Sequence, residues 1–163
     1  MRPSTLFTAA FALLLAVFVS ACDTNSRSAA DIDLYVTEVN FDVARATVNG
    51  TVLSQQYSVP AIDANYGVVL AYFYEQGTWT AMPYTYAVDD PQQKAVSYTI
   101  SLGHAYSNRT FEVFYESSAA DVNLRQQPNR RIKVVVLGPD LAAKQGVDYS
   151  DYEAVKRAFH LPD

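Results

Sequence analysis

The stretch Val68–Glu75, with the sequence VVLAYFYE, is followed by Gln76-Gly77 and then by Thr78–Ala87, with the sequence TWTAMPYTYA. Both segments are short and rich in β-branched and aromatic residues, which favours β-strands over helices. Gln76-Gly77 between them predicts a tight hairpin turn. Pro83 interrupts the second segment, so we expect that strand to lie at the edge of a sheet or to contain a bulge. This pair of segments indicates that the 163-residue chain is built mainly from antiparallel β-strands.

Apolar and polar residues alternate in several segments on either side of this hairpin. Val96–Leu102 alternates without an error, and Phe111–Glu116 alternates with Phe114 as the one exception. Such alternation is typical of strands with one face in water, whereas Ile132–Leu137 is apolar on both faces and predicts a central strand. Strands are expected near 34–41, 44–53, 66–75, 78–87, 95–102, 109–117 and 130–137. Seven short strands separated by turns predict an antiparallel β-sandwich, with a small β-barrel as the alternative.

The periodicity changes after Gly138-Pro139, where a strand pattern gives way to a helical one. Ser150, followed three residues later by Glu153, predicts a capping box at the start of a helix over 151–159. This helix places three apolar side chains on one face: Tyr152, Val155 and Phe159. Because a helix of about nine residues is unstable alone, we expect this face to dock on the sandwich and to bury Phe159.

The first residues have the pattern of a lipoprotein leader. Residues 1–21 combine a positive charge at Arg2 with an apolar run and small residues, as a secretory signal peptide does. Val19-Ser20-Ala21-Cys22 resembles the lipobox of bacterial lipoproteins, in which the peptidase cuts just before a lipidated cysteine. Cys22 is the only cysteine, so no intramolecular disulfide explains it. The sequence therefore predicts acylation of Cys22 with palmitate-type chains, a polar tether over 22–32 and one domain over 33–163.

These features predict a protein of the cell envelope, held by its N-terminal lipid on the extracytoplasmic side of a bacterial membrane. Asp23, directly after the cysteine, resembles the inner-membrane retention signal of enteric bacteria, a rule that does not transfer safely to other phyla, so both membranes stay open. The formal net charge is −5 and no Lys/Arg cluster occurs, which argues against a nucleic-acid partner. A glycan or another envelope protein is the expected partner, and no cofactor is expected.

Four segments resemble an uncharacterised family of small secreted or lipid-anchored proteins from the Bacteroidota, some of which carry a collagen-like repeat. The resemblance spans roughly Val59 to Leu161. It rests on four stretches of the chain: GVVLAYFYEQGTWTAMPYTY (Gly67–Tyr86), FEVFYESS (Phe111–Ser118), RRIKVVVLGP (Arg130–Pro139) and DYEAVKRAFHL (Asp151–Leu161). The chain lacks the collagen-like repeat. These motifs are structural in character, so the resemblance implies an architecture and no activity.

Motifs for catalysis or metal binding are weak. The chain contains no glycine-rich phosphate loop, no GxSxG and no HExxH motif. Of the two histidines, His104 is expected in a loop near Gly103, and His160 near a helix C-terminus, where its charge complements the dipole. Asp63 and Asn65 have the spacing that begins a calcium loop but lack the later acidic ligand, so we expect a turn there and no metal site. A hydrolase that uses Asp89 or Asp90 together with a second carboxylate is the weakest hypothesis.

Aromatic content is the one feature above background, with 12 tyrosines in the chain. Five aromatic residues cluster around the predicted hairpin: Tyr72, Tyr74, Trp79, Tyr84 and Tyr86. Cross-strand packing explains them most simply. The alternative is a platform for sugar rings, as in carbohydrate-binding β-sandwich modules. We therefore expect a lipid-anchored, non-catalytic binding or envelope-structural module, with carbohydrate binding by these aromatic residues as the alternative.

Overall fold

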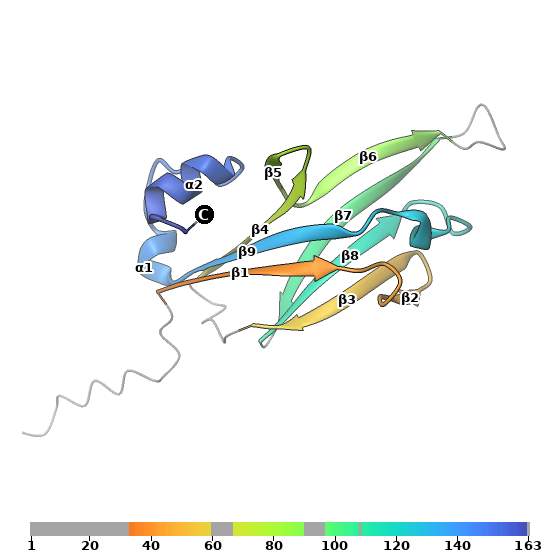
Figure 1. Cartoon of the computed structure of the whole chain (residues 1–163), viewed down its shortest axis with the longest axis horizontal. Helices are drawn as coiled ribbons and strands as arrows, with labels where there is room; N and C mark the ends of the chain where they lie inside the picture. The colour runs from red at the N-terminus through yellow and green to blue at the C-terminus, as the bar shows by residue number, and fades with distance from the viewer. Residues whose placement is uncertain (1–32, 60–66, 90–96, 108, 163) are drawn as a thin grey trace, which may run out of the picture.

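The computed structural model describes residues 33–59, 67–89, 97–107 and 109–162. Two antiparallel sheets face each other as separate layers and do not close into a barrel (Figure 1), which confirms the β-sandwich prediction. Two short α-helices follow the last strand, and the second of them is the helix expected at the C-terminus. Within these residues, no helix is both long enough and apolar enough to cross a membrane.

Within the described residues, nine strands are divided four and five between the two sheets. The first sheet has the order β1 (Leu34–Phe41), β9 (Arg130–Leu137), β4 (Val68–Glu75) and β5 (Thr78–Ala81). The second sheet has the order β2 (Thr47–Asn49), β3 (Val52–Ser58), β8 (Thr110–Ser117), β7 (Ser97–Ser107) and β6 (Tyr84–Asp89). The helical segments are η1 (Leu124–Gln126), α1 (Pro139–Ala142) and α2 (Tyr152–Phe159).

The predicted strand over 78–87 changes sheets in the middle. It divides at Met82-Pro83, whose peptide bond is cis, into β5 of the first sheet and β6 of the second. Both halves are edge strands, as Pro83 predicted, because proline has no N–H for a neighbouring strand. The N–H of Met82 still donates to the carbonyl of Ala71, 2.9 Å away, at the crossing. The crossing carries the second half of the segment out of the first sheet.

Two other predicted boundaries are wrong. The single strand expected over 44–53 is a turn followed by a β2–β3 hairpin, because Gly50 adopts a positive φ of 59° and reverses the chain. The strand expected over 95–102 continues to Ser107 and contains Gly103, which had been expected in a loop. A Cβ at position 103 would lie 2.5 Å from the ring of Phe114, so the glycine makes room for that ring inside the sheet.

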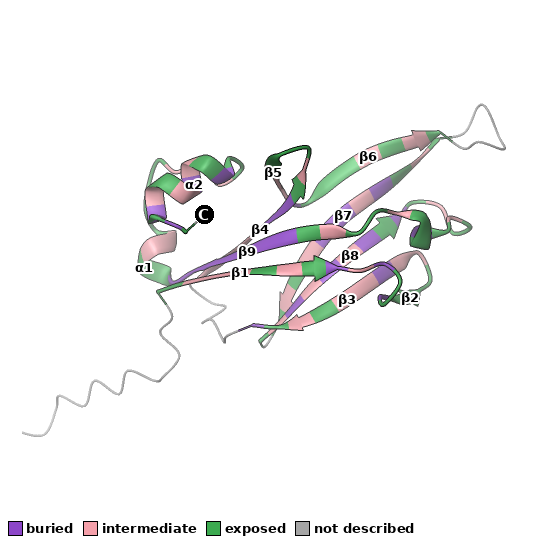
Figure 2. Ribbon diagram, in the orientation of Figure 1, coloured by how far each residue is buried: buried purple, intermediate pink, exposed green. Residues whose placement is uncertain are grey.

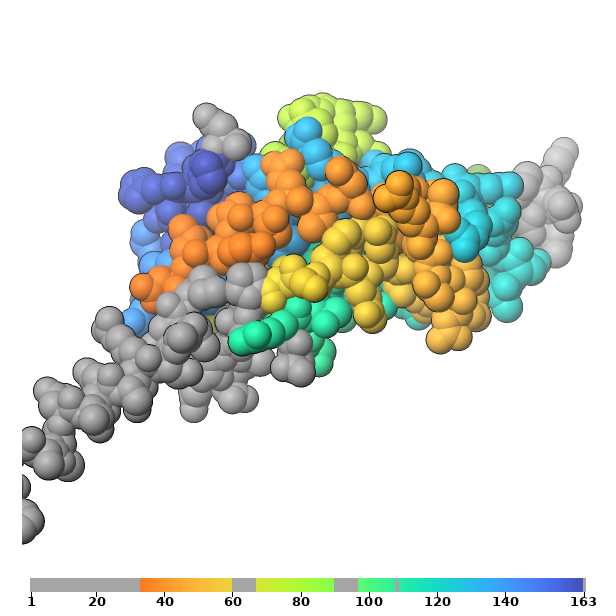
Figure 3. All heavy atoms as spheres, turned by 60° about the horizontal axis from the view of Figure 1, so that its bottom comes forward, coloured from red at the N-terminus to blue at the C-terminus, as the bar shows by residue number. Residues whose placement is uncertain are grey.

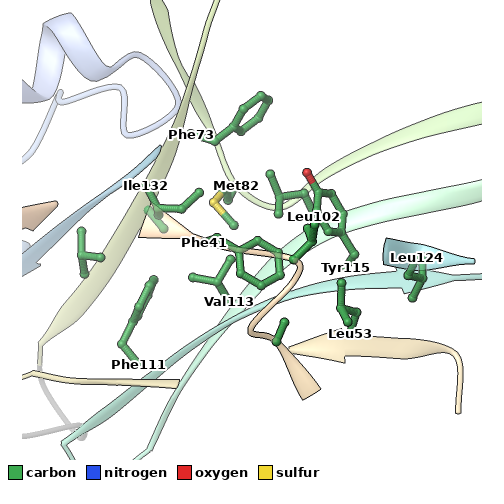
Figure 4. Close-up of a cluster of buried hydrophobic side chains, with 14 of the residues drawn as sticks. Phe41, Leu53, Phe73, Met82, Leu102, Phe111, Val113, Tyr115, Leu124 and Ile132 are labelled. Carbon is green, nitrogen blue, oxygen red and sulfur yellow. The ribbon is translucent and has the colours of Figure 1, made fainter. Parts of the chain in front are cut away.

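The main core lies between the two sheets. In Figure 4, Phe41, Leu102, Val113 and Tyr115 lie close together, and none is more than 1% exposed. At one side of the sandwich β1 lies beside β3 (Figure 3). The Tyr57 hydroxyl of β3 donates there to the Asn40 carbonyl of β1, 2.7 Å away. The sheets are thus joined at this side.

A second apolar cluster lies on the outer face of the first sheet, beneath the helices. It consists of Tyr72, Val135, Leu137, Tyr152, Val155, Phe159 and Leu161. The part of the first sheet beneath the helices is therefore covered on both faces, which explains why Ile132–Leu137 is apolar except for Lys133; the part of β9 nearest α1 is buried in Figure 2. Phe159 is 7% exposed, so its predicted burial is confirmed.

The N-terminus of α2 differs in detail from the prediction. The cap is Asp151, whose carboxylate accepts from the Glu153 N–H at 2.9 Å, and not Ser150. Ser150 instead donates its hydroxyl to Asp148, 2.7 Å away. This bond and the Ser150 N–H hold the pKa of the Asp148 carboxyl below its usual value. Because Ser150 bonds within the preceding turn, the N-cap is one residue later than predicted.

Candidate binding site

The five aromatic residues singled out in the sequence separate into two groups. Tyr72, Tyr74 and Trp79 belong to β4 and β5 of the first sheet, whereas Tyr84 and Tyr86 belong to β6 of the second. The crossing at Met82-Pro83 causes this separation, since it moves the chain from one layer to the other. The five side chains therefore do not form one common platform.

Tyr72 is buried in the outer cluster beneath α2. Its ring is 0% exposed and lies 5.2 Å from the ring of Tyr152, and its hydroxyl donates to the Tyr149 carbonyl at 2.8 Å. Burial, with a smaller contribution from nearby Tyr152, raises the pKa of Tyr72 well above its usual value. A fully enclosed ring that holds the helical segment to the sheet is not accessible to a ligand.

Cations cover the rings of Tyr74 and Trp79. The guanidinium of Arg131 lies 4.2 Å from the ring centre of Tyr74 and 5.1 Å from that of Trp79. The ammonium of Lys133 lies 4.6 Å from the ring centre of Trp79, and its Nζ donates to the Tyr152 hydroxyl at 3.0 Å. These contacts form an outer cation–aromatic layer, defined here by Tyr74, Trp79, Arg131 and Lys133, in which the rings pack against the protein's own charges.

Glu38 of β1 balances this layer. Its carboxylate lies 3.1 Å from the Lys133 ammonium and 3.4 Å from the Arg131 guanidinium. The Lys133 side chain is only 5% exposed. Burial lowers its pKa, but the hydrogen bonds to Tyr152 and Glu38 outweigh burial and raise it overall, so Lys133 carries its charge in the folded protein.

Tyr84 and Tyr86 line a pocket of about 390 Å³ where β6 faces β9 and β4. This volume is within the range of small-molecule sites. The lining residues are Glu75, Tyr84, Tyr86, Gln127, Pro128 and Arg130. They come from the end of β4, the beginning of β6, the segment after η1 and the beginning of β9, so the fold gathers four separate parts of the chain here.

Tyr84 presents the most accessible aromatic ring of this pocket. Tyr84 is 42% exposed. The centre of its ring lies 5.3 Å from the ring centre of Phe73 and 6.1 Å from that of Tyr86. The Tyr86 hydroxyl donates to Gln127 Oε1 at 2.5 Å. Burial, followed by the nearby Tyr115, raises the pKa of Tyr86 to about 12, so its hydroxyl stays protonated and holds the Gln127 amide in place.

Arg130 supplies the fixed charge of the pocket. Its Nη1 lies 2.6 Å from Glu75 Oε1, its Nε donates to the Tyr115 hydroxyl at 3.2 Å, and its guanidinium lies 5.1 Å from the ring centre of Phe73. Tyr115 in turn donates to the Pro128 carbonyl at 3.0 Å. Burial lowers the pKa of Arg130, but the bonds to Glu75 and Tyr115 raise it overall. The guanidinium is thus held on three sides.

The other residues singled out in the sequence are either outside the described residues or away from the described lining of this pocket. Cys22, Asp63, Asn65 and Asp90 lie outside the described residues, and Asp89 is exposed at the end of β6. No group of three or more His, Cys, Asp or Glu side chains able to hold a metal occurs within the described ranges.

The two histidines differ in environment. His160 is exposed and has a positive φ of 54° where α2 ends. His104 was wrongly expected in a loop: it belongs to β7, and its ring lies 5.6 Å from Phe111. Its buried Nδ1 has no hydrogen-bond partner among the described residues, and burial lowers its pKa. These properties indicate a neutral histidine packed inside the sandwich.

Sequence reasoning missed Glu75, Gln127 and Arg130 as site residues. Glu75 and Arg130 are 55 positions apart, and no local motif links them. The one available signal was the Arg130-Arg131 pair directly before an apolar strand, because successive strand residues point to opposite faces. One of two adjacent arginines therefore had to face the space between the sheets.

A second hollow lies on the outer face of the five-stranded sheet, with a volume of about 330 Å³. Its lining residues are Gln56, Ala105, Ser107, Thr110 and Glu112. Its described lining contains no aromatic ring and no cation, so the pocket at Tyr84 offers more groups for recognising a ligand.

Comparisons with family models, curated proteins and solved structures return no match to this chain. The assignment of a function therefore depends on the chemistry of the pocket and on the sequence patterns alone.

Proposed function

We propose that this protein is a lipid-anchored binding protein of the bacterial cell envelope, and that the pocket at Tyr84 binds a carbohydrate ring. The observation that carries the proposal is an accessible tyrosine ring next to an amide and a guanidinium that are both held in position. The role is binding and not catalysis in this proposal.

The pocket combines the two kinds of contact that a sugar needs. The apolar C–H face of a sugar ring packs on an aromatic ring, and no cation lies over Tyr84 among the described residues. Sugar hydroxyls need donors and acceptors at defined positions. Gln127 Oε1 already accepts from Tyr86, so its amide nitrogen is left to donate, and Arg130 adds further N–H donors.

The number of carboxylates in the pocket favours binding over hydrolysis. Glycosidases use a pair of carboxyl groups on either side of the scissile bond. The described lining of this pocket supplies one, Glu75, and that carboxylate is paired with Arg130.

The position of the pocket suits a protein anchored at Cys22. Leu34, where the described chain enters the sandwich, pairs with Leu137 at one end of β9, whereas Arg130 pairs with Phe41 at the other end. Seven residue steps along a strand separate the two ends by about 23 Å. If a lipid at Cys22 holds the first end near the bilayer, the pocket opens on the distal part of the domain.

Calorimetric titration of the purified full-length protein in detergent, with a panel of oligosaccharides, tests the proposed binding. Tyr84→Ala should reduce affinity by up to about tenfold, because contact with an aromatic ring contributes about 0.5–1.5 kcal/mol beyond the area that it buries. Tyr74→Ala is the matched control, since Tyr74 is 37% exposed on the outer layer and should bind as the wild type does. Equal affinity of wild type and Tyr84→Ala, or no binding by either, would refute the proposed site.

The anchor is tested separately, with radiolabelled palmitate and membrane fractionation. The wild type should incorporate label and sediment with membranes, whereas Cys22→Ser should do neither. A wild type without label and a Cys22→Ser variant that still sediments would show that the apolar run over residues 6–19 is a retained membrane helix.

A further inference from the structure

The guanidinium of Arg130 is only partly used by the protein. Glu75 engages Nη1 and Tyr115 engages Nε, whereas Nη2 makes no hydrogen bond with any described residue. Arginine recognises a carboxylate best through two parallel N–H···O bonds, which requires a second nitrogen of the fork. Arg130 therefore retains a free donor group inside a pocket that is lined by an aromatic ring.

Glu75 differs from Arg130 in how firmly it is held. The Arg130 side chain is 15% exposed and is fixed by Tyr115 and Phe73, whereas the Glu75 side chain is 40% exposed. No other hydrogen bond of the Glu75 carboxylate is present among the described residues. If Glu75 leaves its position, its charge is released to water, while the arginine stays in place.

We infer that the pocket takes an acidic sugar, whose carboxylate replaces that of Glu75 on Arg130. This inference rests on the proposed carbohydrate-binding function and specifies its ligand class. In the free protein, Glu75 pairs with a guanidinium that would otherwise be buried without a counter-charge, which is costly. In the complex, the ligand carboxylate takes over that pairing and adds a bond to Nη2, while the sugar ring packs on Tyr84.

Neutral and acidic sugars of the same shape provide the sharpest test. Trisaccharides of galactose and of galacturonic acid differ at each unit by a CH₂OH group and a carboxylate. Both are titrated by calorimetry into the full-length wild type and into Glu75→Gln, which removes the competing charge but keeps the side-chain size. The ratio of acidic to neutral affinity should rise by about tenfold in Glu75→Gln. The ligand carboxylate no longer competes with Glu75 for Arg130, and about tenfold corresponds to the contribution of about one charge-assisted hydrogen bond.

Glu38→Gln is the matched control. Glu38 is also 40% exposed and also pairs with an arginine, but on the outer layer, so this variant should leave the ratio unchanged. Arg130→Lys keeps the positive charge but removes the fork, and it should abolish the preference for the acid in either background. Melting curves of every variant establish that it is folded.

The outcomes separate the inference from the function on which it rests. If the wild type binds the galactose trisaccharide through Tyr84 and Glu75→Gln leaves the affinity ratio unchanged, the acidic-sugar inference is wrong and the proposed function stands. If the wild type binds neither trisaccharide nor any sugar of the wider panel, both fail. A raised ratio that is equal in Glu75→Gln and Glu38→Gln would reflect general charge repulsion and would also overturn the inference.

Discussion

The pocket and the outer cation–aromatic layer use the same chemistry with opposite results. Each contains an arginine that is paired with a glutamate whose side chain is 40% exposed, and a tyrosine of similar exposure, 42% for Tyr84 and 37% for Tyr74. Arg131 lies over the ring of Tyr74, whereas no cation lies over the ring of Tyr84 among the described residues.

The arginine is placed differently in the two regions. In the outer layer it covers the tyrosine, and in the pocket Phe73 and Tyr115 hold it beside the tyrosine. The comparison teaches that exposure alone does not identify a binding ring. What occupies the face of the ring decides whether a ligand has access to it.

The largest loss of stability is expected in the apolar cluster that covers the outer face of the first sheet. Phe159→Ala should lower the free energy of unfolding by about 3–5 kcal/mol, because Phe159 is 7% exposed and closes the cluster beneath α2. Urea unfolding measures the change. Sugar binding, measured where the variant is folded, should persist, because the pocket lies outside this cluster. A truncation before Gly146 that melts like the wild type would instead show that the helix contributes no stability.

An intermediate loss of stability is expected from a substitution inside the pocket. Tyr86→Phe removes the hydroxyl that holds Gln127 and should cost about 1 kcal/mol of stability, with a loss of sugar affinity. Tyr57→Phe is the matched control, because its hydroxyl also makes one bond, to the Asn40 carbonyl, and neither residue lines the pocket. It should lose similar stability and keep full affinity. If both variants lose affinity equally, the role of Gln127 in the pocket is wrong.

The smallest loss of stability is expected in the outer cation–aromatic layer, where a substitution tests directly whether an uncovered ring binds sugar. Arg131→Ala uncovers the ring of Tyr74, while Lys133 still lies over Trp79, and should lower stability by less than about 1 kcal/mol, since the arginine side chain is 48% exposed. The uncovered ring should still bind no sugar, because no hydrogen bond among the described residues fixes an amide beside Tyr74 as Tyr86 fixes that of Gln127. Titration of Arg131→Ala combined with Tyr84→Ala detects any new site. Sugar binding by this double variant would show that an open ring suffices.

Much of the architecture follows from local sequence patterns. The alternation in Val96–Leu102 and the apolar run Ile132–Leu137 predicted a half-exposed and a doubly covered strand, and both are present. The helix at Tyr152–Phe159 and the burial of Phe159 also follow from spacing. The predicted strand boundary was wrong where a contact with a residue distant in sequence decides the structure, as the contact between Gly103 and the ring of Phe114 does.

The site was predictable only in part. Tyr84 and Tyr86 were singled out from the sequence, but so were three residues that pack under the helix or under cations. The sequence contains no local sign of which tyrosine is covered, because the covering residues Arg131 and Tyr152 lie more than 50 positions away in the chain. Composition thus identified an aromatic hairpin and left its function open.

The sequence by itself therefore determined most of the strands, an antiparallel β architecture and the docking of the last helix, since hydrophobic periodicity is a property of neighbouring residues. Only the tertiary structure decided that the chain changes sheets at Pro83, and that Arg130 meets Glu75 inside while Arg131 meets Glu38 outside. The physical reason is that pairing between strands brings together residues far apart in the chain. A pocket is made from such pairings, and no window of sequence contains them.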